Sequence, residues 1–260
     1  MIIELGTVGV EGSPALWDPS STNSIHSLVT GMTGGGKTHL TIHIVTQALC
    51  DGAEVWIADG KAGGDYNATK PDRLGNGSEE VTQLLLDAAN EVERRLTVLR
   101  HDVTSRNTPL FIVVDELSAA QLRRRNEDVK SHRDRRELIQ GALSEIALTA
   151  RSANVHLWLV TQRGDVESIP GGGSVRDQLG LRISMGWNSP QGYQMMWPGV
   201  DLRPPFRAEP GWGYISGYVG HREGPRLFFA SEGDMGNRRE FRHTPRLPWR
   251  RRSLRHGEEA

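Results

Sequence analysis

The feature that most constrains the fold is a glycine-rich stretch of eight residues at positions 31–38, Gly-Met-Thr-Gly-Gly-Gly-Lys-Thr. It fits the pattern G-x-x-x-x-G-K-[ST], in which glycines let backbone N–H groups curl around phosphate oxygens. An apolar run (Ile25, Leu28, Val29) precedes the stretch, and apolar residues at helical spacing follow it. The sequence therefore predicts a strand, a phosphate-binding loop and a helix whose N-terminus faces the phosphates.

This loop predicts a nucleotide contact for each of its residues. Lys37 is expected to reach the β and γ phosphates, and Thr38 to hold Mg²⁺. The other candidates lie in the same loop or directly after it: Gly31, Met32, Thr33, Gly34, Gly35, Gly36 and His39. The alternative is a glycine-rich turn that matches by chance, since the chain has 30 glycines. The flanking strand and helix patterns favour the nucleotide site.

Three later apolar runs of strand length each end in polar residues. Residues 54–58 run into Asp59-Gly60-Lys61, residues 110–114 into Asp115-Glu116, and residues 155–160 into Thr161-Gln162-Arg163. Because parallel strands place chemistry at their carboxyl ends, these polar residues are expected to share one edge of a sheet. There Asp115 would bind Mg²⁺, Glu116 would polarise an attacking water, and Gln162 would sense the γ phosphate. For Asp115-Glu116 the alternative is an ordinary helix-capping acidic pair.

The segments between these strands predict helices and loops. Residues 62–77, rich in Gly, Asn, Asp and Pro, predict a loop, and Ser78 predicts the N-cap of a helix that ends near Arg100. Residues 119–137 are strongly charged and predict either a solvated helical face or a mobile loop. Apolar residues at three- and four-residue spacing then predict an amphipathic helix that begins near residue 138 and ends near residue 154.

The C-terminal third predicts shorter elements. A glycine loop at 171–173 precedes a strand over 181–187, and Ser189-Pro190 predicts the start of a short helix. Residues 212–219 and 226–230 predict a final pair of strands across a turn. The whole pattern predicts an α/β fold with a mostly parallel sheet flanked by helices and a C-terminal antiparallel hairpin.

Composition divides the chain into three expected parts. Residues 1–24 predict a strand or hairpin with a covering loop, residues 25–230 one large domain, and residues 231–260 an arginine-rich tail. The tail composition predicts disorder or extra nonspecific phosphate contact. Cys50 is the one cysteine, which excludes an intrachain disulfide and a cysteine-built zinc site.

Nothing in the sequence predicts a membrane span or a signal peptide. The longest apolar runs are strand-sized, far below the roughly 18 residues of a spanning helix. The start of the chain carries Glu4 and no basic residue. We therefore expect a cytoplasmic protein that contacts a membrane only through a partner.

Several motifs together resemble the FtsK/SpoIIIE group of DNA-pumping motors within the RecA-like additional-strand ATPases. The resemblance runs from about Ile25 to Tyr218. Its most specific part is residues 150–163, which are similar to the family's Arg-x-x-x-[IV]-His-Leu-…-Thr-Gln-Arg signature. The other matching segments are residues 31–38, Asp59-Gly60-Lys61 where the family has Asp-Pro-Lys, Glu91-Val92-Glu93-Arg94-Arg95, and Val113-Val114-Asp115-Glu116.

The resemblance implies a RecA-like P-loop core that hydrolyses ATP with Mg²⁺ and translocates double-stranded DNA. It also implies a homo-oligomeric ring, with a hexamer as the expected form. Arg151 is the candidate arginine finger for a neighbouring subunit, with an ion pair inside its own subunit as the alternative. Arg163, Arg176 and Arg182 lie in the region that resembles the family's pore loop, where they would touch backbone phosphates. Each of these three alone could equally be an ordinary surface arginine.

Two departures from the family pattern, Gly60 and Gly164 in place of prolines, predict looser loops. The absence of a membrane anchor, long linker and winged-helix domain favours a mobile-element, plasmid-transfer or phage-encoded relative over a cell-division protein. Two other functions stay open. One is an FtsK-like ATPase that drives protein secretion, and the other is an ATP-binding assembly module with negligible hydrolysis.

Overall fold

The fold is built on one mixed sheet, seen here in a computed structural model that describes residues 1–9, 11–122, 124–162, 169, 172–202, 210–221 and 224–230. The strands are β1 (Ile3–Val8), β2 (Ser13–Trp17), β3 (Ser27–Gly31), β4 (Glu54–Asp59), β5 (Arg73–Asn76), β6 (Leu110–Asp115), β7 (Val155–Val160), β8 (Leu181–Met185), β9 (Trp212–Ser216) and β10 (Arg226–Ala230). They form a 10-stranded sheet in the order β2-β1-β10-β9-β8-β3-β7-β6-β4-β5.

Strand direction divides the sheet into two parts. From β8 to β5 every neighbouring pair is parallel, whereas the pairs from β8 through β9, β10 and β1 to β2 are antiparallel. The strand β7 lies between β3, which leads into the glycine-rich loop, and β6, which ends in the acidic pair. The predicted mostly parallel sheet with a C-terminal antiparallel hairpin is confirmed.

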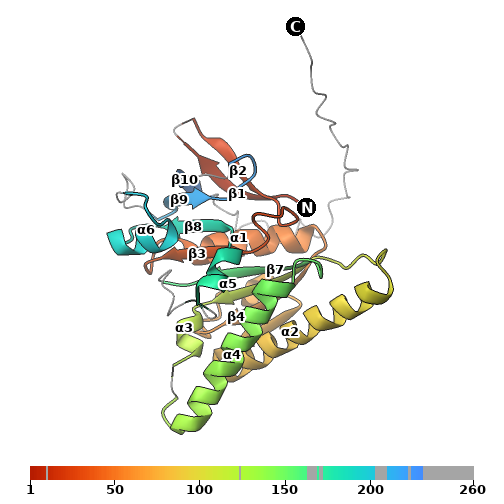
Figure 1. The fold of residues 1–260 in the computed structure, drawn as a ribbon. Helices are drawn as coiled ribbons and strands as arrows, with labels where there is room; N and C mark the ends of the chain where they lie inside the picture. The colour runs from red at the N-terminus through yellow and green to blue at the C-terminus, as the bar shows by residue number, and fades with distance from the viewer. Residues whose placement is uncertain are drawn as a thin grey trace.

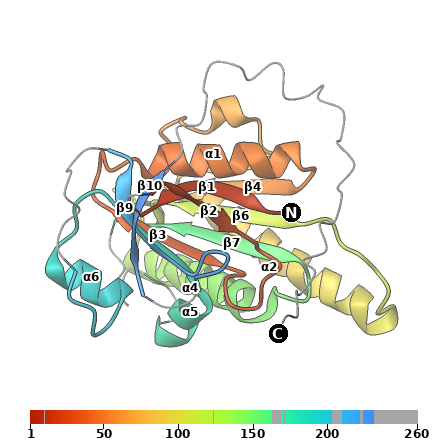
Figure 2. The same ribbon diagram turned by 90° about the horizontal axis from the view of Figure 1, so that it is seen from above.

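Helices cover both faces of this sheet (Figures 1 and 2). The helices are α1 (Lys37–Cys50), α2 (Gly77–His101), α3 (Leu117–Ala120), α4 (Val129–Thr149), α5 (Gly172–Gln178) and α6 (Pro190–Met196), with a 3-10 turn η1 (Asn67–Thr69). Figure 2 shows α1 on one side of the strands and α2, α4 and α5 on the other. No helix in the described part of the chain has the length and apolar character needed to cross a membrane.

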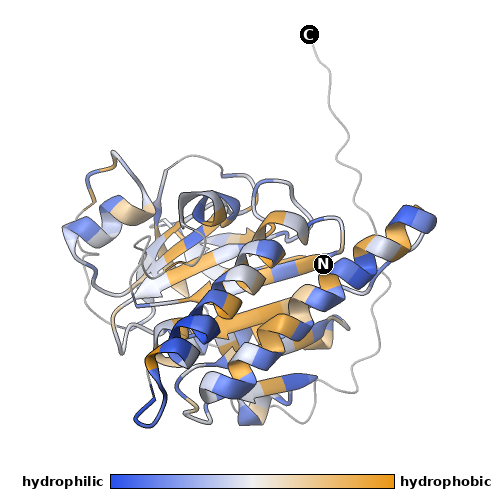
Figure 3. Cartoon of the chain, turned by 60° about the horizontal axis from the view of Figure 1, so that its bottom comes forward, coloured by the Kyte–Doolittle hydropathy of each residue, from blue (hydrophilic) through white to orange (hydrophobic). Residues whose placement is uncertain are grey.

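The two faces produce two hydrophobic cores. One joins α1 to β1, β2 and one face of the central strands, and the other joins α2, α3, α4, α5 and α6 to the opposite face. Every residue of β6 and β7 is buried, as expected for parallel strands covered on both sides. The hydrophobic colour in Figure 3 accordingly concentrates on the central strands.

Some local predictions were wrong because tertiary contacts override local propensity. The predicted loop over 62–77 contains η1 and the edge strand β5, which is stabilised by parallel pairing with β4. The N-cap of α2 is Asn76, and Ser78 lies inside the helix. In the charged segment 119–137, by contrast, the alternative of a solvated helical face is correct for residues 129–137, the mostly exposed start of α4, which Asp128 caps by accepting from the Ser131 N–H at 3.0 Å.

Other boundaries shift less. The helix predicted near 138–154 begins at Val129 and ends at Thr149. Of the glycine loop predicted at 171–173, Gly172 and Gly173 open α5, and residue 171 lies outside the described residues. Ser189 caps α6 as predicted, accepting from the Gly192 N–H at 3.0 Å. The N-terminal segment supplies β1 and β2 to the same sheet, next to β10. Gly164 and the tail at 231–260 lie outside the described residues.

Candidate active site

The glycine-rich loop between β3 and α1 is shaped by close contact with β8. A Cβ atom on Gly31, whose φ is +140°, would lie 2.1 Å from the carbonyl oxygen of Met185. A Cβ on Gly35 would lie 2.9 Å from the same oxygen. Gly36 has a left-handed φ of 100° and caps the N-terminus of α1. These positions require glycine, and the loop therefore exposes backbone at the start of a helix, where anions bind.

Lys37 is the first residue of α1 and lies buried inside this loop. Its ammonium group donates to the carbonyl oxygens of Gly31 at 2.6 Å and Met32 at 3.1 Å. Burial lowers the pKa of Lys37, while the nearby carboxylates of Glu116 and Asp115 oppose that shift. The lysine is thus held in the loop, within electrostatic reach of the acids that end β6.

Strand register brings the polar ends of the parallel strands to one level. Asp59 of β4 pairs with Asp115 of β6, which pairs with Val160 of β7, and Val160 in turn pairs with Val29 of β3. Asp115 is buried and accepts from the Tyr66 hydroxyl at 2.5 Å. Burial raises the pKa of Asp115, and the Tyr66 hydrogen bond opposes that rise.

Glu116 follows Asp115 in a backbone conformation that is unusual for a side-chain-bearing residue. Its φ of 51° and ψ of 48° are left-handed, a conformation that costs about 1–3 kcal/mol and concentrates at functional sites. The buried carboxylate lies 3.0 Å from the Lys61 ammonium and receives Gln162 Nε2 on both oxygens at 3.2 Å. Residues after β4 and β7 therefore orient this carboxylate, as general-base chemistry requires.

The acids are of a type that could hold a magnesium ion together with the phosphates of a bound nucleotide. Asp115, Asp59 and Glu116 gather three carboxylates at the sheet edge, and both neighbours raise the pKa of Asp115. No group of three or more His, Cys, Asp or Glu side chains in the described residues could enclose a metal alone. Magnesium usually binds one or two carboxylates together with substrate phosphates, which is the arrangement that these residues offer.

Gly60 corrects one expectation from the sequence. Its N–H donates to the Asp115 carbonyl oxygen at 2.9 Å, and a Cβ there would lie 2.3 Å from the Glu116 carbonyl oxygen. Replacing the family's proline by Gly60 therefore does not loosen the loop. It lets the end of β4 approach the backbone of Glu116 and adds a hydrogen bond that proline cannot donate.

Sequence reasoning missed two residues of this site. Tyr66 lies in the segment predicted as a loop, yet it is 1% exposed and contacts Asp115. The sequence signal was an aromatic residue isolated among Gly, Asn and Asp in residues 62–77. The sequence places Lys61 at this edge of the sheet but assigns it no role, and the structure shows its ion pair with Glu116.

No family model matches the chain. The FtsK domain-containing protein YdcQ of Bacillus subtilis (strain 168) is 28% identical over 202 residues, which cover 74% of this chain and 40% of YdcQ. The pCW3 conjugation coupling protein TcpA, in its monomer form with ATPγS, matches with a TM-score of 0.70 and 19% identity over 90% of this chain and 66% of TcpA. The sequence is thus similar to that of an FtsK domain-containing protein, and the fold is that of a P-loop ATPase structure.

Secretion ATPases share the fold of this chain. The cytoplasmic domain of the Type VII secretion ATPase EccC from Thermomonospora curvata matches with a TM-score of 0.64 and 22% identity, over 89% of this chain and 28% of EccC. ATPases 2 and 3 of EssC from Geobacillus thermodenitrificans match with a TM-score of 0.65 and 18% identity, over 89% of this chain and 41% of that structure. The chain therefore spans less than half the length of YdcQ, EccC and this EssC structure.

The structure places Arg151 away from the loop of its own subunit. Arg151 is exposed and precedes β7, whereas Gln162 follows that strand. The six residues of β7 span about 20 Å, so the two side chains lie at opposite edges of the sheet. Among the described residues, no acid lies within ion-pair distance of Arg151.

The three arginines that the sequence predicts as DNA contacts differ in their placement. Arg163 lies outside the described residues. Arg176 on α5 is half-buried, and its Nε finds no hydrogen-bond partner in the described part of the chain. Arg182 donates to the carbonyl oxygens of Leu179 at 3.1 Å, Met196 at 2.7 Å and Arg176 at 3.2 Å, and burial lowers its pKa. A phosphate contact by Arg182 would require these bonds to break, so its geometry favours a structural role.

Proposed function

We propose that this FtsK-like domain binds ATP with Mg²⁺ at the carboxyl edge of its sheet and hydrolyses it to translocate double-stranded DNA. One observation carries the proposal. The structure gathers Lys37, Asp115, Glu116 and Gln162, which come from three different strand ends, around one glycine-rich loop. Phosphoryl transfer needs positioning and charge stabilisation of this kind.

Each residue would perform a distinct part of the hydrolysis. Backbone N–H groups of residues 31–38 bind phosphate oxygens, and the Lys37 ammonium exchanges its two carbonyl partners for the β and γ phosphates. Thr38 and Asp115 would hold Mg²⁺, which supplies charge neutralisation between the phosphates. Glu116 orients the attacking water and accepts its proton, while Gln162 links that carboxylate to the γ-phosphate position.

The placement of Arg151 supports assembly into a ring. Because Arg151 lies at the opposite edge of the sheet from its own Lys37, it would complete a site only on a neighbouring copy. Head-to-tail contacts of this kind close into rings, and a homohexamer is the form we propose. DNA would follow the pore-loop region, with Arg163 and Arg176 as the proposed phosphate contacts.

The similarity to TcpA, a conjugation coupling protein, supports DNA as the cargo and plasmid or mobile-element transfer as the process. The test is the ATPase rate with and without linear duplex DNA at low salt. Duplex DNA is expected to stimulate turnover, and Lys37→Ala or Glu116→Gln to reduce it by about 10²–10⁴-fold. Glu93→Gln, an exposed acid on α2, is the matched control and should keep the full rate. An ATPase rate that is the same with and without duplex DNA would contradict the translocase part of the proposal.

A second candidate is protein translocation, which the similarity to EccC and EssC supports. It predicts capture of a protein substrate and no retardation of DNA in a gel at low salt. A third candidate, an ATP-binding assembly module, predicts bound nucleotide with negligible turnover even with DNA and Mg²⁺. The oriented carboxylate of Glu116 argues against the third candidate.

A further inference from the structure

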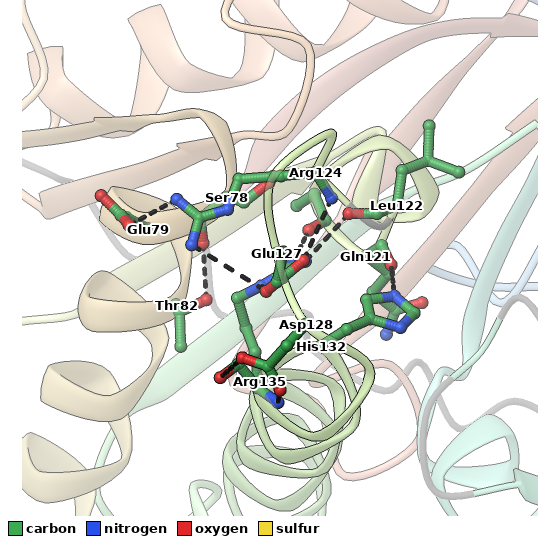
Figure 4. Close-up of polar contacts among 12 residues, drawn as sticks. Ser78, Glu79, Thr82, Gln121, Leu122, Arg124, Glu127, Asp128, His132 and Arg135 are labelled. Atoms are coloured by element: carbon green, nitrogen blue, oxygen red, sulfur yellow. Dashed lines mark hydrogen bonds and ion pairs between the residues drawn. The ribbon is translucent and has the colours of Figure 1, made fainter.

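The segment directly after Glu116 is held by side chains from another helix. The helix α3 has 4 residues, too short to be stable without outside contacts. Three successive carbonyl groups at its C-terminal end, those of Ala120, Gln121 and Leu122, lack partners within so short a helix. Figure 4 shows the side chains of α4 that reach them.

Arg135 and His132, one turn apart on α4, contact all three carbonyls. Arg135 donates through Nη1 to the Ala120 oxygen and through Nη2 to the Leu122 oxygen at 2.9 Å. His132 Nε2 lies 2.9 Å from the Gln121 oxygen (Figure 4). A planar guanidinium can contact two carbonyls and a carboxylate at once, which a lysine ammonium on a flexible stem does less well.

Glu127 neutralises this buried arginine. Arg135 Nε and Nη2 donate to its two carboxylate oxygens at 2.9 Å and 2.8 Å, and the Arg124 N–H donates to it at 3.0 Å. The Arg135 hydrogen bond lowers the pKa of Glu127 to about 2. We call Arg135, Glu127 and His132 the α3 anchor.

The other end of α3 is also fixed, and it is Glu116. A Cβ on Gly60 would approach both the Glu116 carbonyl oxygen at 2.3 Å and the Ala120 nitrogen at 3.0 Å. The residues from Glu116 to Leu122 thus form one short rigid connection, with the left-handed Glu116 at one end and the α3 anchor at the other.

We propose that Arg135 is a positioning residue for the proposed ATP hydrolysis, acting through α3 to hold Glu116 in its left-handed conformation. The inference rests on the proposed function. Arg135 contacts no expected substrate atom, so its loss should affect the orientation of the Glu116 carboxylate and leave the nucleotide loop unchanged. A misplacement of about 1 Å at a catalytic group can lower the rate by about 100-fold.

The first experiment compares Arg135→Met with a matched variant of a second buried arginine, Arg95→Met. Arg95 also donates to two carbonyl oxygens and to carboxylates, but it lies at the amino edge of the sheet. We expect Arg135→Met to lower kcat by about 10–100-fold with ATPγS affinity within about twofold of the wild type. Arg95→Met should keep kcat. Equal loss in both variants, or loss of affinity in parallel with kcat, overturns the proposal.

The second experiment places Arg135→Met in a Glu116→Gln background. If Arg135 acts only through Glu116, the double variant turns over no more slowly than Glu116→Gln alone. A further loss contradicts the proposal. If the wild-type protein does not hydrolyse ATP at all, the proposed function fails instead, and hydrogen–deuterium exchange then tests the effect of Arg135 on α3 without any need for turnover.

A third measurement needs no activity. Hydrogen–deuterium exchange of the nucleotide-free protein should speed up at amides 117–122 in Arg135→Met and stay unchanged there in Arg95→Met. Unchanged exchange at 117–122 overturns the proposal.

Should Arg135→Met fail to fold, Glu127→Gln serves in the same assays, since it weakens the ion pair with Arg135 and keeps the side-chain shape. It should lower kcat in the same direction but by a smaller factor than the one expected for Arg135→Met, and an unchanged kcat in Glu127→Gln would contradict the proposal.

Discussion

The two edges of the parallel sheet carry buried charge in opposite ways. At the amino edge, Arg95 is matched by Glu91 and by the carbonyl oxygens of Thr108 and Ala153. At the carboxyl edge, Asp59, Asp115 and Glu116 face two lysines, Lys37 and Lys61, and burial raises the pKa of Asp115. Among these described residues, the arginine of the amino edge finds its partners within the chain, whereas the carboxylates of the carboxyl edge outnumber the lysines.

This difference indicates that the carboxyl edge contributes less to the stability of the fold than the amino edge does. Burying charge without full compensation is unfavourable, and proteins tolerate it at sites that bind a ligand. The left-handed Glu116 adds backbone strain at the same edge. The comparison therefore supports the carboxyl edge as the proposed functional edge without reference to any sequence motif, and it can be tested by changes at each edge.

The largest expected effect on stability is at Gly60. Gly60→Ala places a Cβ 2.3 Å from the Glu116 carbonyl oxygen, and we expect the free energy of unfolding to fall by about 3 kcal/mol, because the backbone at this edge must shift. Urea unfolding measures the change. Gly141→Ala on α4 is the control, since a Cβ there meets nothing within 4 Å, and it should stabilise by about 0.5–1 kcal/mol. A urea unfolding midpoint of Gly60→Ala equal to that of the wild type would contradict this prediction, because it would mean that the backbone here can shift at little cost.

The next effect concerns two buried histidines near the amino edge. Burial lowers the pKa of His26 to about 3 and of His156 to about 4 in the folded protein, against 6.5 normally. The unfolded chain therefore binds protons below pH 6.5 before the folded chain does. The contribution of the two neutral histidines to the free energy of unfolding is therefore fully present above pH 6.5. It falls as the pH drops toward 4, by about 1.4 kcal/mol per pH unit for each histidine.

The variant His26→Asn tests this pH dependence. The asparagine carbonyl can still accept the Leu157 N–H that His26 Nδ1 receives at 2.9 Å, but it does not titrate. The wild-type protein loses unfolding free energy between pH 7 and pH 5, and we expect this loss to be about 2 kcal/mol smaller in the variant, which is the part that His26 alone contributes. Urea unfolding at the two pH values measures it, and an unaltered pH dependence in the variant would contradict the assignment.

The smallest expected effect is a change in the free energy of unfolding that has opposite signs at the two edges when one acid is neutralised. Asp115→Asn removes a carboxylate whose pKa is raised by burial, so it should stabilise the fold by about 1 kcal/mol at pH 7 while abolishing Mg²⁺-dependent turnover. Glu91→Gln is its counterpart at the amino edge. Hydrogen bonds from Arg94 and Arg95 lower the pKa of Glu91 to about 2, so neutralising it should destabilise. Shifts of the same sign in both variants would remove the distinction between the edges.

Much of this arrangement was predictable from the sequence. The continuous apolar runs that became β6 and β7 end at Asp115 and Val160, within one residue of the predicted ends, because parallel strands buried on both faces need apolar residues at every position. The loop 31–38 was equally clear, because phosphate binding demands glycine and lysine at fixed spacing. The strand β5 was missed because its pairing with β4 decides it. The charged segment 119–137 left a helical face and a loop open, and capping by Asp128 decides that α4 begins at Val129.

The sequence by itself determined the alternation of strands and helices, the glycine-rich loop and the acidic end of β6, because these depend on local periodicity and on residue types at fixed spacing. Only the tertiary structure decided that Tyr66 contacts Asp115, that Lys61 and Gln162 orient Glu116, and that Arg135 anchors α3. These contacts join residues that are distant along the chain, or that lie on separate elements. Their partners are set by strand order and helix packing, which no local pattern encodes.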